Sequence, residues 1–335
     1  MKKLKKQKMS CLKRRIGNNI LPIFLSLLFF FISGCDYGEI KSKATIGETT
    51  IYVDENLEPI LNDLKSEFER IYTQAKVNFI VKPAKVAIAD LLNRDHKIIL
   101  VARDFNEEET KFIKEIKLDI QRYEVALDGI GFVVNPSSPI ERLTSSDLKK
   151  IFTGEVKYWT DIKVQDEEQN QKAKLFFKGR DNEIRVYIQR PNSSAYEFVK
   201  DTILEKMNFV ESARICSTSV QLLEGIRKHK NAIGFINLAW ISVGNQDEQD
   251  TTVKPVRISR IMPSGKQYDF EIFHQGTVAY RKYPYIRKVY LFSTEFDFTA
   301  ATGFATFLLH SDGQKVILKR GLVPITQPIR IIQLE

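Results

Sequence analysis

Polar side chains that could hold a small anion gather in one short stretch, RPNSSAYEFVKDTIL at residues 190–204. Asn192, Ser193 and Ser194 come directly before an amphipathic run whose apolar residues repeat at helical spacing. Two interpretations fit this pattern. Ser194 with Glu197 three residues later has the spacing of a capping box, in which the two side chains satisfy backbone N–H groups at the helix start. The same helix start could instead bind an anion, because its free N–H groups and the positive end of its dipole attract negative charge.

Two further polar clusters each follow an expected strand and open an expected helix. The first is Asp54, Glu55 and Asn56, and the second is Arg103 and Asp104. With the stretch that begins at Arg190, the sequence contains three such clusters. In open α/β sheets, ligands bind beyond the carboxyl ends of strands, where helix N-termini converge. Arginine suits an oxyanion, and a carboxylate such as Asp104 would select phosphate, which still carries a proton near neutral pH, over sulfate, which does not. We therefore predict an oxyanion site made by Asp54, Glu55, Asn56, Arg103, Asp104, Arg190, Asn192, Ser193 and Ser194.

Nothing in the residue pattern indicates catalytic or metal chemistry. The four histidines are scattered, and the sequence contains no HExxH, GxSxG, GxxxxGK[ST] or CxxC motif. The carboxylates at 107–109 lie in an expected helix first turn, where negative charge suits the dipole. We expect a binding protein that is not an enzyme and uses no cofactor and no metal.

The N-terminus has the pattern of an export signal. Residues 1–34 carry eight Lys and Arg and no acidic residue, and an apolar run at 20–32 is shorter than the roughly 20 residues of a membrane-spanning helix. The run exits through Ile-Ser-Gly-Cys, which resembles a bacterial lipobox and implies that Cys35 is lipidated. We predict a signal peptide at 1–34, a polar tether at 35–48, and an exported protein anchored by lipid to a cell-envelope membrane.

Removing this signal changes what the charge implies. The whole chain is +9, and without the eight positive charges of the signal it is +1, so no nucleic-acid partner is indicated. Of the three cysteines, Cys11 lies in the signal and Cys35 is assigned to the lipid, which leaves Cys216 alone. No intramolecular disulfide is expected.

The remaining chain alternates strands with helices, which predicts an α/β protein with a mostly parallel sheet covered on both faces. Strands are expected at 51–53, 77–81, 98–102, 129–134, 176–177, 186–188, 232–236, 277–280 and 289–292. Helices are expected at 57–72, 86–92, 106–116, 144–152, 194–204, 220–226, 299–309 and 313–320, and polar loops at 161–174 and 243–250.

The stretch LTSSDLKKIFTGEVKYWTDI at 143–162 resembles the signature region of phosphate-binding proteins of ABC uptake systems, the PstS-like type II periplasmic binding proteins. VALDGIGFVVNPSSPI, IQRPNSSAYEF, NAIGFINLAW and GTVAYRKYPYIRKVYLF are similar to further segments of that family, in the same order. The resemblance implies two α/β lobes joined by two crossover strands. Lobe 1 would comprise 49–125 plus 275–335, and lobe 2 would comprise 126–274.

The resemblance also implies a function. A PstS-like protein captures inorganic phosphate by hinge closure and delivers it to ABC permease subunits, and we expect this one to be a monomer. Two segments differ from the family pattern: Asn192-Ser193-Ser194-Ala195 replaces the usual Ser-Gly-Thr, and Lys82-Pro83-Ala84-Lys85 replaces a Gly-Ser-rich turn. These differences leave open a lipoprotein of the same fold that senses phosphate or has a structural or adhesion role, or a receptor for another oxyanion.

Overall fold

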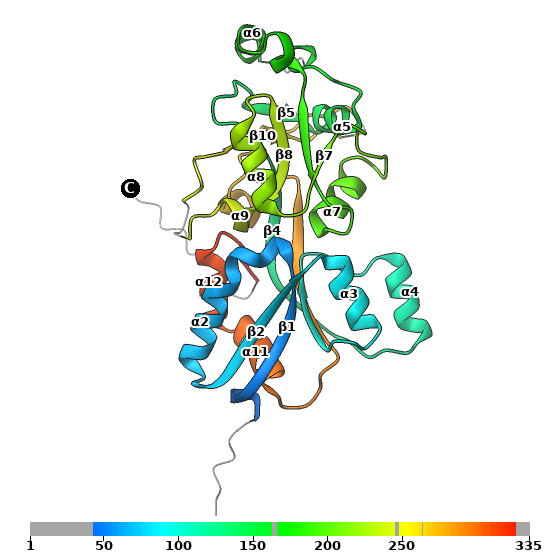
Figure 1. The fold of residues 1–335 in the computed structure, drawn as a ribbon, viewed down its shortest axis with the longest axis vertical. Helices are drawn as coiled ribbons and strands as arrows, with labels where there is room; N and C mark the ends of the chain where they lie inside the picture. Colours follow the sequence, from blue (N-terminus) through cyan, green and yellow to red (C-terminus); the bar gives the residue numbers. More distant parts are fainter. Residues whose placement is uncertain (1–42, 163–165, 245–247, 263, 326–335) are drawn as a thin grey trace, which may run out of the picture. The chain divides into compact units, whose positions relative to one another are not determined.

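Apart from a separate two-stranded sheet of β5 (Arg142–Thr144) and β10 (Arg257–Ser259), the strands of the computed structural model form two groups that share one long strand, β4 (Gln121–Val134) (Figure 1). The structure describes residues 43–162, 166–244, 248–262 and 264–325, so the expected signal peptide and Cys35 lie outside the described residues. The first half of β4 pairs with β11 (Ile286–Ser293), and its second half pairs with β8 (Ala232–Asn237). The proposed boundary between lobes at 125/126 therefore falls inside a strand that runs through both groups.

The first group has the order β2-β1-β3-β11-β4, and the second has the order β4-β8-β6-β7. The bounds of the remaining strands are β1 Ile46–Asp54, β2 Gln74–Lys82, β3 Ile98–Val101, β6 Arg185–Gln189, β7 Arg214–Cys216, β9 Lys254–Pro255 and β12 Val323–Pro324. Strands β1, β2 and β3 are parallel to one another, as are β6, β7 and β8, whereas β11 and β4 run antiparallel to their neighbours. The sheet is thus mixed, with its parallel parts on either side of β4 and β11.

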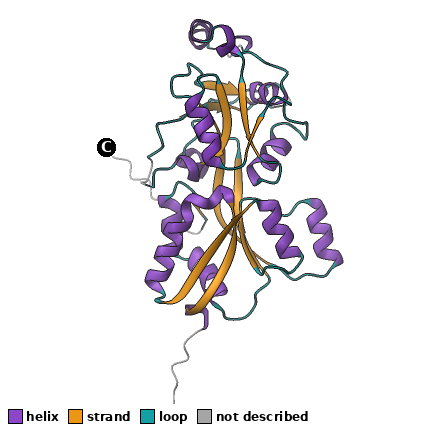
Figure 2. Ribbon diagram, viewed as in Figure 1, coloured by secondary structure: helices purple, strands orange, loops and turns teal. Residues whose placement is uncertain are grey.

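Helices lie on both faces of the strands (Figure 2). Their bounds are α2 Leu61–Ile71, α3 Ala84–Leu92, α4 Glu107–Glu115, α5 Ser145–Thr153, α6 Glu167–Phe176, α7 Ser194–Thr202, α8 Ser219–Lys228, α9 Leu238–Ile241, α10 Gln275–Ala279, α11 Ala300–Leu309 and α12 Ser311–Lys319, with short 3-10 helices η1 Lys43–Thr45, η2 Glu55–Ile60, η3 Trp159–Asp161 and η4 Gly179–Asn182. Strand β3 shows why both faces must be covered: Ile98 and Leu100 join the core that includes α2 and α11, whereas Ile99 and Val101 join the core that includes α3. An all-apolar strand of this kind is typical of a sheet buried on both faces. The α/β fold with a mixed sheet expected from the sequence is confirmed.

Three local predictions were wrong. Residues 161–174 do not form a loop throughout, because α6 begins at Glu167 with Asp166 as its cap. Helix α6 buries only Gln169 and Ala173, so the sequence offers no apolar stripe from which to predict it, and Phe176 ends this helix instead of starting a strand. The strand expected at 277–280 is the short helix α10, since strand propensity in a four-residue run is easily overridden by tertiary packing.

The N-terminal edge of the described chain is more ordered than the expected tether. Strand β1 begins at Ile46, so the last three residues of the segment 35–48 belong to the sheet. Before them, η1 contacts α11, where the Ala44 carbonyl oxygen lies so close to Gly303 that a side chain there would not fit. In the part of the chain that the structure describes, no helix combines the length and the apolar character needed to cross a membrane.

Candidate functional site

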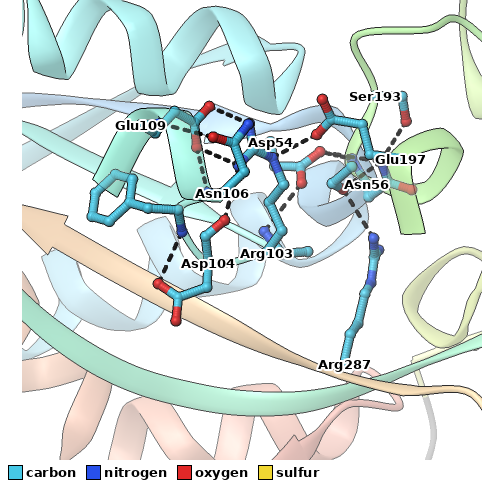
Figure 3. A network of polar contacts seen from close by, with 12 residues as sticks. Asp54, Asn56, Arg103, Asp104, Asn106, Glu109, Ser193, Glu197 and Arg287 are labelled. Carbon is cyan, nitrogen blue, oxygen red and sulfur yellow. Dashed lines mark hydrogen bonds and ion pairs between the residues drawn. The ribbon is translucent and has the colours of Figure 1, made fainter. Parts of the chain in front are cut away.

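Asp54 ties the ends of two neighbouring strands together. It is the last residue of β1 and is fully buried. Its Oδ1 accepts the backbone N–H of Asn56 at 3.0 Å, and its Oδ2 accepts the backbone N–H of Ala102, just after β3, at 3.1 Å. These bonds fix the start of η2 and hold the side chain of Asn56 at the carboxyl edge of the sheet (Figure 3).

Asn56 reaches from this edge to the start of α7. Its Nδ2 lies 3.2 Å from the Oγ of Ser193 and 3.2 Å from the Oγ of Ser194, and 3.1 Å from Oδ1 of Asp54. Both serines are fully buried, although 137 and 138 positions separate them from Asn56. The structure therefore brings together Asp54, Asn56, Ser193 and Ser194, four of the nine predicted site residues.

Of the two interpretations of the start of α7, the capping box of Ser194 and Glu197 is wrong. Helix α7 begins at Ser194, its N-cap is Ser193, and no side chain makes a capping hydrogen bond there. The Ser193 hydroxyl donates to Oε1 of Gln189, and the carboxylate of Glu197 forms an ion pair with Arg103. Since the first backbone N–H groups of a helix have no partner within it, those of α7 remain available to a ligand.

Arg103 is held between two carboxylates. Its Nη1 and Nη2 donate to Glu109 of α4 at 2.7 Å each, and its Nε lies 2.6 Å from Oε2 of Glu197 on α7. Burial raises the pKa of the Glu197 carboxyl above its ordinary value, against the opposing effect of the Arg103 charge. Arg103 thus connects the first strand group to α7.

Asp104 does not join this cluster. Its carboxylate points away from Asn56 and Ser193 in Figure 3 and pairs with Arg122, and its side chain is 43% exposed. The Asp104 carboxylate also accepts the backbone N–H of Phe105 at 2.9 Å. In this orientation the Asp104 side chain makes no hydrogen bond with Ser193 or Ser194.

A second ion pair, between Glu55 and Arg190, also links the two strand groups. Arg190 Nε donates to Oε2 of Glu55 at 3.1 Å, and burial raises the pKa of Glu55 even though Arg190 opposes the shift. Beside this pair, the carbonyl oxygen of Asn192 accepts the N–H of Lys85 at 3.3 Å. The Asn192 Oδ1 is buried and has no hydrogen-bond partner among the described residues.

Arg287 of β11 is a cluster residue that the sequence prediction missed. Its Nη1 donates to the Oγ of Ser194 at 3.0 Å, and its Nε donates to Oδ2 of Asp128 on β4 at 2.9 Å. Arg287 is 4% exposed and Asp128 is 0% exposed, and burial raises the pKa of Asp128 against the pull of the guanidinium. The available signal was a charged residue inside each of two apolar strand runs, since such residues are seldom buried unless paired.

The buried side-chain amides of Gln189 and Asn237 hold the two segments that carry the cluster. Gln189, which accepts from Ser193, donates through Nε2 to the Oγ of Ser219 at 3.1 Å, and Asn237 donates through Nδ2 to the carbonyl oxygen of Asn56 at 3.0 Å. These bonds fix the loop before α7 and the turn after β1 from the second strand group. Sequence reasoning missed both amides.

The cluster suits a small oxyanion. Ser194, Arg287 and the N-terminus of α7 offer hydrogen-bond donors, one of them fully charged, from elements that meet at one place. Within the described ranges, His, Cys, Asp and Glu side chains form no group of three that could hold a metal ion. Ser194 and Arg287 also line a cavity of about 970 Å³, together with residues of α4 and α7.

A family model described as a PBP superfamily domain matches residues 40–312. The chain belongs to the PBP superfamily. The match extends over both strand groups and every candidate site residue, so the cluster lies within the family domain.

Relatives that are similar in sequence to this PBP superfamily protein share the name "Phosphate-binding protein PstS". "Phosphate-binding protein PstS" of Borreliella burgdorferi is 23% identical over 317 residues, which are 91% of this chain and 98% of the relative. The protein of that name from Staphylococcus saprophyticus is 20% identical over 82% of this chain and 76% of its own length.

Solved structures agree on the fold. A Clostridium perfringens protein with bound phosphate superposes with a TM-score of 0.66 at 18% identity, covering 83% of this chain and 100% of its own. An ABC-type phosphate transport receptor from Vibrio cholerae gives a TM-score of 0.60 at 18% identity, with 83% and 100% covered. This PBP superfamily chain therefore has the fold of these proteins, as the sequence resemblance implied.

Proposed function

We propose that this protein captures inorganic phosphate on the outer side of a membrane and delivers it to an ABC permease, without chemical conversion of the anion. The observation that carries the proposal is the meeting of Ser194 Oγ with Arg287 Nη1, 3.0 Å apart, at the N-terminus of α7. A buried guanidinium, a hydroxyl and free helix N–H groups are the donors that a multiply charged oxyanion needs. The names of the relatives, phosphate-binding proteins over almost the whole chain, support the same ligand.

The mechanism we propose is hinge closure around the anion. Asp54, Asn56 and Arg103 belong to the proposed lobe 1, and Ser193 and Ser194 belong to the proposed lobe 2, so an anion bound at α7 would be enclosed from both sides. Strand β4 runs from the proposed lobe 1 into the proposed lobe 2 and would serve as part of the hinge, with β11 paired beside it. Arg287 lies on one of these strands, which would let it contact the anion in both the open and the closed form.

The anchor is part of the proposal. Cys35 would carry lipid and become the N-terminus, which keeps the receptor beside its permease. The Cys35→Ala variant is expected to leave the membrane fraction while its circular dichroism spectrum stays that of the wild type. If the variant stayed in the membrane fraction, the proposed lipid anchor would be wrong, and the proposal that phosphate is the ligand would be unaffected.

Calorimetry tests the ligand. We expect phosphate to bind, and Ser194→Ala to weaken it by about 1–3 kcal/mol because a buried anion oxygen loses its donor. Thr218→Ala is the matched control, since it removes the cap of α8, where Thr218 Oγ1 accepts the N–H of Gln221 at 3.2 Å. The control should lower the free energy of unfolding by about 0.5–2 kcal/mol and leave phosphate affinity alone. Equal phosphate affinity in the wild type and Ser194→Ala would refute the proposed site.

One observation favours a second function. Asn56 Nδ2 donates to both serine oxygens at 3.2 Å and the Ser193 hydroxyl donates to Gln189, so part of the hydrogen-bonding capacity of the serines is already used by the protein. A lipoprotein that senses phosphate weakly, or has a structural or adhesion role in the same fold, would fit such a site. The same titration separates the two functions when phosphate, sulfate and molybdate are compared: binding of none of the three favours the structural role.

A further inference from the structure

The cavity above the phosphate site is much larger than inorganic phosphate requires. Its volume is about 970 Å³, and Ser194 and Arg287 are among its lining residues. Water occupies about 30 Å³ per molecule in the liquid, so the cavity corresponds to roughly thirty waters. Phosphate has only five non-hydrogen atoms, whereas sites for small organic ligands span about 300–1,000 Å³.

Separation of the two strand groups does not account for this volume, because three contacts already join them. Asn56 bonds the serines at the start of α7, the Nε of Arg103 lies 2.6 Å from Glu197, and Glu55 pairs with Arg190. The Arg103–Glu197 pair itself lies among the lining residues. The remaining space is therefore present while the two sides of the site are in contact.

The walls of this cavity are partly aromatic. Tyr196 and Phe198 of α7 line it and are half-buried, and so is Phe105, which precedes α4. Partly exposed aromatic side chains are the groups on which ligand rings stack. The rings of Phe105 and Tyr196 also pack against Phe292 and Phe209, and the faces they leave exposed offer apolar surface that inorganic phosphate does not use.

Charges of both signs line the same opening, with acidic residues of the loop before α4 and of α7 beside the basic ones. Lys85 of α3 and Lys206 after α7 line the cavity and are exposed, and Lys85 lies close enough to Glu197 to oppose the rise of its pKa. Arg287 and Ser194 thus favour an anionic group at the inner end of the ligand, and the aromatic walls favour a ring beside it.

We propose that the site takes phosphate monoesters, with the phosphoryl group at Ser194 and Arg287 and the organic group against Phe198 and Phe105. The inference rests on the proposed function, because the phosphoryl group would bind at the same proposed phosphate site. A monoester keeps three terminal oxygens and its negative charge, so the helix N-terminus and Arg287 bind it as they bind phosphate. The ester oxygen would then direct the organic group away from Ser194 and Arg287 and into the cavity.

Calorimetry with three probes tests the inference: inorganic phosphate, methyl phosphate and phenyl phosphate. We expect phenyl phosphate to bind at least tenfold more tightly than methyl phosphate, a difference of about 1.4 kcal/mol. The Phe198→Ala variant should remove that difference and leave the dissociation constant of inorganic phosphate unchanged. Phe112→Ala is the matched control, because Phe112 lies on α4, is 41% exposed and is not among the residues that line the cavity.

Each outcome separates the inference from the proposed function. Binding of inorganic phosphate with no binding of either ester overturns the inference and leaves the proposed function intact. Equal affinity for methyl and phenyl phosphate, or loss of the difference in Phe112→Ala as well as in Phe198→Ala, overturns the role of the aromatic walls. Failure of all three probes to bind removes the phosphate site and the inference together.

Discussion

The ion pair between Arg287 and Asp128 gives the sharpest test of how β11 is held to β4, the strand that the two groups share. Both side chains are buried, at 4% and 0% exposure, and they join β11 to β4 through Nε and Oδ2 at 2.9 Å. The Arg287→Met variant removes the guanidinium and leaves the carboxylate without its cation. Breaking a buried pair in this way costs about 3–5 kcal/mol, because the remaining charge has lost the water it had in the unfolded chain.

The loss of stability should depend on pH with a definite sign. Burial already raises the pKa of Asp128 above its ordinary value of 3.8, and loss of Arg287 removes an effect that lowers it. The pKa in the folded variant is therefore higher than in the wild type, so the folded variant holds a proton that the unfolded chain releases. The deficit of the variant is largest at pH 7 and shrinks as the pH falls through that raised pKa.

Urea unfolding followed by circular dichroism, at pH 7 and at pH 4.5, measures both effects. The double variant Asp128→Asn with Arg287→Met is the control, since the asparagine keeps an acceptor for the Leu238 N–H but carries no charge. We expect the double variant to be more stable at pH 7 than Arg287→Met alone and to show no pH-dependent deficit. Simple additivity of the two substitutions, with a pH-independent loss, would refute the reasoning.

Three other substitutions test single features. Glu197→Gln removes a carboxyl whose pKa is raised by burial, so wild-type stability relative to the variant should fall as the pH rises from 4.5 through that raised pKa; a constant difference in urea unfolding would contradict this. Gly131→Ala should lower the free energy of unfolding by about 1–3 kcal/mol, because the new Cβ would lie 2.1 Å from Cδ1 of Phe273, and Phe273→Leu in the same chain should restore part of the loss in thermal unfolding. Asp104→Asn should change stability by less than about 1 kcal/mol and leave the ratio of phosphate to sulfate affinity unchanged in calorimetry, since its partly exposed carboxylate pairs with Arg122; a fall in that ratio would return Asp104 to the anion site.

Local sequence pattern determined most of the elements that carry the site. Apolar runs such as Ile98–Val101 and the capping box of Asn106 and Glu109 each depend on residues within a few positions, and the structure confirms both. The pattern failed where burial was slight, as in α6, or where a run was short, as in α10. Periodicity is informative only when enough apolar residues face a core.

The polar clusters at strand ends were also visible in the sequence, because strand order in an α/β sheet brings carboxyl ends to one edge. That rule placed Asp54, Asn56, Ser193 and Ser194 in one site, and they meet there. It could not give the rotamer of each side chain. Arg103 and Asp104 are adjacent, yet one points to Glu197 and the other to Arg122.

Only the tertiary structure decided the partners of the buried charges. Arg287 meets Asp128 across 159 positions and Ser194 across 93, and Glu55 meets Arg190 across 135. No local propensity links residues so far apart; they pair because folding removes water from each charge, and an opposite charge or a donor must replace it. The sequence alone therefore determined most of the elements and the edge of the sheet at which the polar residues meet, whereas packing decided which buried side chains pair with one another.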